Sequence, residues 1–154
     1  MITRADVIAC AREWIGTRWQ HQASLRAVGC DCIGLVGGVA RELDLPGGIQ
    51  WTNDPGIRGY GREPDPQVLL WACGKYLDPG AGVVGDILLL RAPPANTAIA
   101  DVCKFPPRHF GIASRPGYMI HAWAQLRKVS ENRIDEFWRA RIVGFYSYRG
   151  LSNG

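Results

Sequence analysis

Cysteine and histidine are the residue types in this sequence that could carry nucleophilic chemistry, and the chain has five cysteines but only three histidines. Cys32 follows Cys30 and Asp31 at the start of a segment with helical periodicity. The unpaired N–H groups and the positive dipole end at a helix start favour an anion, which would lower the pKa of a thiol there. Cys32 is therefore the candidate nucleophile.

Two of the histidines fall in consecutive segments with strand character, "HFGIASR" and "YMIHAW". Antiparallel pairing of these strands predicts that His109 and His121 lie close together at one end of a sheet. With Cys32 they would form a nucleophile, a base (His109) and a residue that orients the base (His121). The backbone N–H of Cys32 could also donate to a developing oxyanion. The pattern indicates chemistry at an acyl group.

The neighbouring thiol, Cys30, leaves other interpretations open. Four side chains have the right types for a tetrahedral zinc site: Cys30, Cys32, His109 and His121. Cys-x-Cys is tighter than the usual zinc spacing, and dithiol redox enzymes generally use Cys-x-x-Cys. We expect Cys30 to be a packed or partly exposed thiol, and we expect no metal and no other cofactor.

Other polar residues near these motifs have less specific roles. We expect Asp31 to cap the helix, with contact to a substrate amine as its second possible role. His21 is expected to be a solvated loop residue. Three arginines could meet substrate carboxylates, although no feature of the sequence singles one out: Arg91, Arg108 and Arg115.

The elements that must position these residues come as helices first and strands afterwards. Apolar residues recur at helical spacing over 4–15 and 32–43. Asp65 and Pro66 suit the cap and first turn of a third helix that runs to about residue 77. Four later segments read as strands: "GDILLLRA", "HFGIASR", "YMIHAW" and "RIVGFYSYR". This order predicts an α+β fold, with N-terminal helices packed on a central antiparallel sheet.

Length and composition bound the remaining possibilities. With 154 residues, 47% of them hydrophobic, the chain fits one domain over residues 1–154 with a substantial core. The net charge of +4 is scattered without a basic run, so we expect no nucleic-acid partner. No apolar run approaches the roughly 18 residues of a membrane span, and "MITRADVIACAREWIG" lacks the apolar stretch of a signal peptide. We expect synthesis in the cytoplasm and no membrane insertion.

Three segments are expected to be loops: 17–29, 46–64 and 92–108. The last two are long and rich in Pro, which suits either a lid over a cleft or a docking surface.

Four segments resemble, in order, the motifs of the NlpC-type cell-wall peptidases, a family of papain-like cysteine peptidases: "GTRWQHQASLRAVGCDCIGLV", "GDILLLR", "HFGIAS" and "MIHAW". The resemblance covers the chain from about Gly16 to the C-terminal strand and is closest to the branch found in phage tails and gene transfer agents. It implies a papain-like NlpC-type fold. It also implies that Cys32 is the nucleophile, that His109 is the base and that His121 orients it.

The resemblance further implies hydrolysis of an amide bond in peptidoglycan stem peptides, most often between D-γ-glutamate and diaminopimelate. It implies incorporation into a phage or phage-like particle, with tail or hub proteins as partners and action in the cell wall or periplasm of the recipient cell. Two alternatives remain open. One is a Cys-His acyltransferase of the same fold, and the other is an inactive tail module that is structural or binds peptidoglycan.

Two positions depart from the family's pattern. Ile33 follows the nucleophile where many members have a small Ser, and its bulk could narrow the cleft. The family's Tyr upstream of the nucleophile, which lines the site near the oxyanion, aligns with Trp19. The indole can donate an N–H but has no hydroxyl. Trp19 and Asp31 are therefore the candidate residues for oxyanion or substrate contact.

Overall fold

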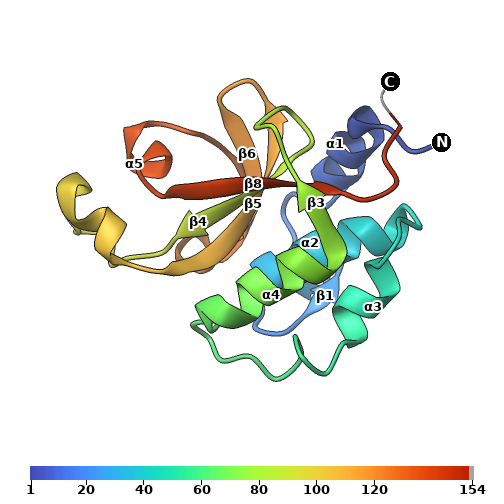
Figure 1. Cartoon of the computed structure of the whole chain (residues 1–154), viewed down its shortest axis with the longest axis horizontal. Helices are drawn as coiled ribbons and strands as arrows, with labels where there is room; N and C mark the ends of the chain where they lie inside the picture. Colours follow the sequence, from blue (N-terminus) through green and yellow to red (C-terminus); the bar gives the residue numbers. More distant parts are fainter. Residues whose placement is uncertain (153–154) are drawn as a thin grey trace.

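A six-stranded antiparallel sheet forms the centre of the computed structural model, which describes residues 1–152 (Figure 1). The strands lie in the order β3-β8-β4-β5-β6-β7. Their bounds are β3 (Leu77–Pro79), β4 (Ile87–Arg91), β5 (Pro107–Arg115), β6 (Tyr118–Trp123), β7 (Lys128–Arg133) and β8 (Ile142–Tyr148). A separate two-stranded sheet pairs β1 (Ser24–Leu25) with β2 (Gly29–Cys30). The predicted α+β fold with an antiparallel sheet is confirmed.

Helices at the N-terminal end of the chain form where the sequence predicted them. They are α1 (Arg4–Glu13), α2 (Cys32–Glu42) and α4 (Pro66–Tyr76), each ending one or two residues before the expected position. Thr3 and Asp6 make a reciprocal capping box at the start of α1, and Asp65 caps α4 ahead of Pro66. Within residues 1–152, no helix is long and apolar enough to cross a membrane.

Several short elements were not predicted. The segment 46–64 contains α3 (Gly48–Asn53), 92–108 contains the 3-10 helix η1 (Ile99–Lys104), and 17–29 contains β1 and the start of β2. The elements β3, β7, η2 (Ala124–Leu126) and α5 (Glu136–Arg139) were also missed. Elements of two to six residues are too short for apolar periodicity to emerge. The strand β7 lies at the sheet edge and is mostly polar, which hides it from a pattern based on burial.

The helix that carries Cys32, α2, is buried along most of its length and packs against β5 and β6. In Figure 1 it lies with α4 and α3 on the same side of the sheet. A Cβ atom at Gly37 would collide with the Trp51 ring, and one at Gly38 would collide with the Trp14 ring. These glycines, which are poor helix formers, therefore allow the close packing that supports α2.

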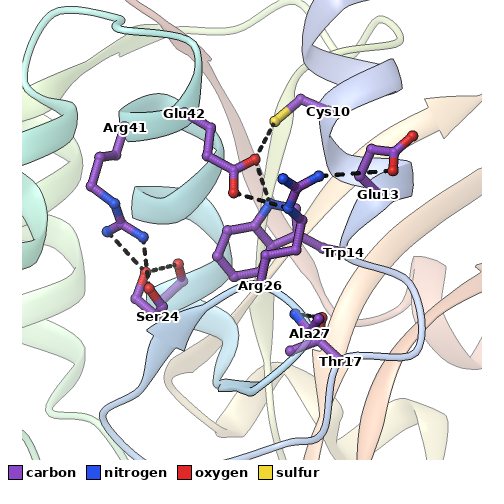
Figure 2. Close-up of polar contacts among 10 residues, drawn as sticks. Cys10, Glu13, Trp14, Thr17, Ser24, Arg26, Ala27, Arg41 and Glu42 are labelled. Carbon is purple, nitrogen blue, oxygen red and sulfur yellow. Dashed lines mark hydrogen bonds and ion pairs between the residues drawn. The ribbon is translucent and has the colours of Figure 1, made fainter.

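Polar contacts fix the position of α2 relative to α1 and to the 17–29 segment (Figure 2). The Arg41 guanidinium donates to the backbone oxygen of Ser24 at 2.6 Å. The Glu42 carboxylate accepts from Trp14 Nε1 at 3.3 Å and pairs with Arg26 at 3.2 Å. These contacts anchor the C-terminal end of α2, the helix that begins with Cys32.

Candidate active site

Cys32 is the first residue of α2, and its side chain is buried, with 7% exposure. Burial and the nearby charge of Asp31 raise the pKa of the Cys32 thiol to about 12. The backbone N–H groups of Phe110 and Ile33 act in the opposite direction and lower this pKa, but they do not outweigh burial. The expectation that the helix start lowers the pKa was therefore wrong for the resting protein, because desolvation exceeds the helix-start effect.

His109 on β5 and His121 on β6 lie together, as the predicted strand pairing required. The two ring nitrogens, His109 Nε2 and His121 Nδ1, are 2.8 Å apart. Burial, followed by the proximity of His121, lowers the pKa of His109 well below its ordinary value. Burial also lowers the pKa of His121 to about 4, against the opposing effect of a hydrogen bond with Asn132. Both imidazoles are therefore neutral near pH 7.

Asn132 on β7 determines which ring nitrogens carry protons. Its Oδ1 atom lies 2.8 Å from His121 Nε2 and also accepts from the Ser130 hydroxyl at 2.7 Å. An amide oxygen only accepts, so His121 Nε2 is the protonated nitrogen and His121 Nδ1 accepts from His109 Nε2–H. The lone pair of neutral His109 is consequently on Nδ1. Sequence analysis missed Asn132 because it missed β7.

Cys32 and His109 line one cleft of about 240 Å³. The thiol sulfur lies near the backbone N–H of Phe110, the residue that follows His109 on β5. Trp19 and Asp31 line the same cleft, as do Tyr60, Trp123 and Trp138. The predicted nucleophile and base are thus brought to one cavity, while His121 is fully buried behind His109.

Asp31 joins three segments beside the nucleophile. Its Oδ1 atom accepts from the N–H of Gly34 at 2.8 Å, which confirms the predicted helix cap. Its Oδ2 atom accepts from the N–H of Gln22 at 2.8 Å and from the Tyr60 hydroxyl at 2.5 Å. Burial raises the pKa of Asp31, and the Tyr60 hydrogen bond opposes that shift. Both oxygens already have donors, so the structure favours capping over contact with a substrate amine.

Tyr60 is a cleft residue that sequence analysis missed. It belongs to the Gly- and Pro-rich 46–64 segment, and the His21 ring packs edge-on against its ring with centroids 5.4 Å apart. Sequence analysis had considered only Trp19 at the position of the family's Tyr. Trp19 does line the cleft, with the Arg62 guanidinium 5.8 Å from its ring centroid. Tyr60, from a different segment than Trp19, therefore brings a tyrosine hydroxyl to the cleft.

Ile33 does not narrow the cleft that contains Cys32, contrary to expectation. Its side chain is buried and lines a separate cavity of about 160 Å³ together with Trp51 and Tyr60. The Ile33 backbone oxygen accepts from Trp51 Nε1 at 2.9 Å. The side chain therefore points away from the thiol, because the helical turn directs consecutive residues to different faces.

Cys30 is fully buried, and burial with the charge of Asp31 raises its pKa to about 12. The prediction of a packed thiol is confirmed. Across residues 1–152, no three His, Cys, Asp or Glu side chains are grouped so that they could hold a metal ion. Cys30, Cys32 and the histidine pair therefore do not form the ligand set that the zinc interpretation needs.

The cleft carries more positive than negative charge. Four arginines and two carboxylates line it: Arg62, Arg91, Arg108, Arg141, Asp31 and Glu63. Among the described residues, none of the four arginines is within 4.0 Å of a carboxylate oxygen. Arg115, by contrast, lies away from the cleft, with its guanidinium 3.7 Å from the Tyr118 ring centroid. Such a surplus attracts an anionic ligand.

Solved NlpC/P60 proteins share this architecture. A lipoprotein-like NLP/P60 protein of Staphylococcus aureus matches 97% of this chain with a TM-score of 0.57 at 13% identity. NlpC2 of Trichomonas vaginalis matches 95% with a TM-score of 0.59 at 15% identity. NlpC1 of the same organism matches 95% with a TM-score of 0.56 at 18% identity.

The chain spans 42%, 46% and 44% of the lengths of these three proteins, respectively. No protein-family model matches the sequence, and no curated protein sequence is significantly similar to it. The comparisons show the fold, which is α+β and papain-like, of the NlpC type.

Proposed function

We propose that this protein is an NlpC-type cysteine peptidase that hydrolyses an amide bond in peptidoglycan stem peptides. One observation carries the proposal: a single cleft holds Cys32 and His109, and the contacts of His109 with His121, and of His121 with Asn132, place the base lone pair on Nδ1. Nucleophile, base and orienting group are the three parts of a cysteine peptidase site. The fold shared with NlpC/P60 proteins supports the same assignment.

At rest the Cys32 thiol and the His109 imidazole, which line the same cleft, are both neutral, so the thiol proton moves as the sulfur attacks. His109 Nδ1 takes that proton while Cys32 Sγ bonds to the amide carbonyl carbon. The imidazolium of His109 then gives the proton to the leaving amine, and a thioester remains on Cys32. Water, deprotonated by His109, hydrolyses the thioester and releases the acid and the free thiol. His121 Nδ1 accepts from His109 throughout and stabilises the transient imidazolium.

We propose the D-γ-glutamyl–diaminopimelate amide as the bond that is cut. The resemblance of the cysteine and histidine motifs to the NlpC-type family supports this choice. The surplus of arginines over carboxylates in the cleft is consistent with it, since stem peptides carry free carboxylates.

We also propose that the protein acts as part of a phage or gene-transfer-agent tail, where it opens the cell wall of the recipient. This proposal rests on the resemblance of its motifs to that branch of the family. Purified particles from a producing strain, analysed by mass spectrometry, should contain the protein together with tail or hub proteins. Its presence in the cell and absence from such particles would contradict the tail role.

The peptidase proposal is tested by incubating the protein, and its Cys32→Ala variant, with purified peptidoglycan and identifying released fragments by mass spectrometry. We expect fragments with new termini at glutamate and diaminopimelate from the wild type only. Equal yields from both proteins would remove Cys32 from the mechanism. No fragments from either would favour an inactive tail module, and transfer of an acyl group to an added acceptor would favour an acyltransferase.

A further inference from the structure

Arg141, directly before β8, is buried in the wall of the cleft without a full set of hydrogen-bond partners. Its residue exposure is 2%. Nη1 donates to the backbone oxygen of Phe137 at 2.7 Å, whereas the buried Nη2 has no partner among residues 1–152. An arginine remains protonated in proteins, so the cleft wall contains a buried cation with an unsatisfied donor. Burying a donor without a partner is unfavourable, so a ligand oxygen that accepted from Nη2 would be bound favourably.

The guanidinium is held rigidly rather than on a free side chain. Its central carbon lies 3.5 Å from the centroid of the Phe137 ring. The backbone N–H of Arg141 donates to the backbone oxygen of Trp138 at 2.9 Å. The backbone oxygen of Arg141 accepts from the backbone N–H of Arg91 at 2.7 Å. Both main-chain groups and one end of the side chain are therefore fixed, which leaves the Nη2 donor pre-organised.

Trp138, on α5, lies three residues before Arg141 and packs against both histidines of the proposed site. The Trp138 ring lies with its centroid 4.9 Å from that of His121 and 6.1 Å from that of His109. Trp138 and Arg141 both line the cleft that contains Cys32. A ligand group on Arg141 would thus share the cavity in which the scissile amide must lie.

The other cleft arginines are engaged differently. Arg91 and Arg108 each donate Nη1 to a backbone oxygen, of Phe105 and Pro64 respectively, and Arg62 lies over Trp19. Of the four, only Arg141 has a buried side-chain nitrogen without a hydrogen-bond partner within residues 1–152.

We propose that Arg141 binds a free carboxylate of the peptide substrate, so that the enzyme selects stem peptides in which a carboxylate beside the scissile amide is not amidated. This inference rests on the peptidase function proposed above. A planar guanidinium suits a carboxylate because both offer paired, parallel hydrogen-bonding atoms. A carboxamide would place an N–H group or a weaker acceptor against the same donor.

Binding to the inactive Cys32→Ala protein tests the inference without requiring turnover. The probe is L-Ala-γ-D-Glu-diaminopimelate, compared with the same peptide carrying a carboxamide either at glutamate or at diaminopimelate, by isothermal titration calorimetry. We expect one of the two amidations to weaken binding about 10- to 100-fold, as for loss of a charge-assisted hydrogen bond. The amidation ratio is the dissociation constant of the amidated peptide divided by that of the parent peptide. Adding Arg141→Gln to the Cys32→Ala protein should reduce this ratio to near one.

Arg139→Gln is the matched control, because Arg139 is an exposed arginine on α5, two residues away. It should leave the ratio unchanged. The inference is overturned if Arg141→Gln leaves the amidation ratio intact, if neither amidation weakens binding, or if the parent peptide does not bind. Thermal melts establish that each variant is folded. If Arg141→Gln is not, Arg141→Lys replaces it and should lose most of the ratio, because it keeps the charge but not the planar pair of donors.

A failure of the peptidase function gives a different result. In that case wild-type protein would leave the free peptide uncut, while carboxylate-dependent binding to the Cys32→Ala protein would persist.

Discussion

His109 Nε2 lies 2.8 Å from His121 Nδ1, and this contact determines which nitrogen of His109 keeps its lone pair free. The proton between the two rings belongs to His109, because His121 must donate its own proton to Asn132 Oδ1. Asn132, on the edge strand β7, thus fixes the tautomers of His121 and His109.

Asn132→Ala should lower kcat about tenfold or more with little change in KM, because Asn132 fixes a tautomer and does not line the cleft. Steady-state kinetics on the γ-glutamyl peptide measures both parameters. Ser130→Ala is the matched control, since the Ser130 hydroxyl bonds the same Asn132 oxygen but not His121. Equal kcat values for the two variants would show that Asn132 does not act through His121.

The pH profile of kcat/KM should be a broad bell. Burial lowers the pKa of His109 and raises the pKa of Cys32 to about 12, so the neutral pair persists over a wide range. The acid limb should lie below the ordinary histidine value of about 6.5, and the alkaline limb above the ordinary thiol value of about 8.5. An alkaline limb below about 8.5 would contradict the raised pKa of the Cys32 thiol.

Stability should fall in acid because of His121. Its pKa is about 4 when folded and about 6.5 when unfolded, so between these values only the unfolded chain takes up the proton. The stabilisation that neutral His121 contributes is complete above pH 6.5. It is lost as the pH falls to about 4, which lowers the free energy of unfolding by about 3 kcal/mol. Urea titrations of wild type and His121→Gln at pH 7.5 and pH 4.5 measure the difference. Parallel losses in both proteins would contradict the assignment.

The three residues of the proposed catalytic site could be located from the sequence because each lies in a segment whose pattern is strong. Cys32 begins a helix with clear apolar periodicity, and His109 and His121 lie in apolar strands that follow each other closely. Register then brought the two rings together as expected. The pKa of Cys32 could not be predicted, because it depends on the burial that β5 and the cleft walls impose.

Two supporting residues were not predictable because they lie in segments without a burial pattern. Asn132 lies on a polar edge strand, and Tyr60 lies in a Gly- and Pro-rich segment. Arg141 follows a four-residue helix, and its burial arises from packing on Phe137 and from β8 pairing with β4. Side-chain burial at such positions depends on tertiary contacts that one sequence does not reveal.

Tyr60→Phe should lower the free energy of unfolding by about 1–2 kcal/mol, because it removes a hydrogen bond to the buried Asp31 carboxylate. Urea denaturation at pH 7.5 measures the change. Tyr118→Phe is the control, since that ring stacks on Arg115 near the sheet surface. Equal stability of Tyr60→Phe and Tyr118→Phe would show that the Asp31 contact contributes nothing.

The central claim is that Cys32, and not the neighbouring Cys30, is the nucleophile. The most direct test compares Cys32→Ala with Cys30→Ala for release of diaminopimelate from the γ-glutamyl peptide, with melting curves to establish that both proteins fold. We predict that Cys32→Ala loses at least about 10³-fold in rate, while Cys30→Ala stays within a few-fold of the wild type. Activity that survives in Cys32→Ala, or that disappears only in a folded Cys30→Ala protein, would contradict the account.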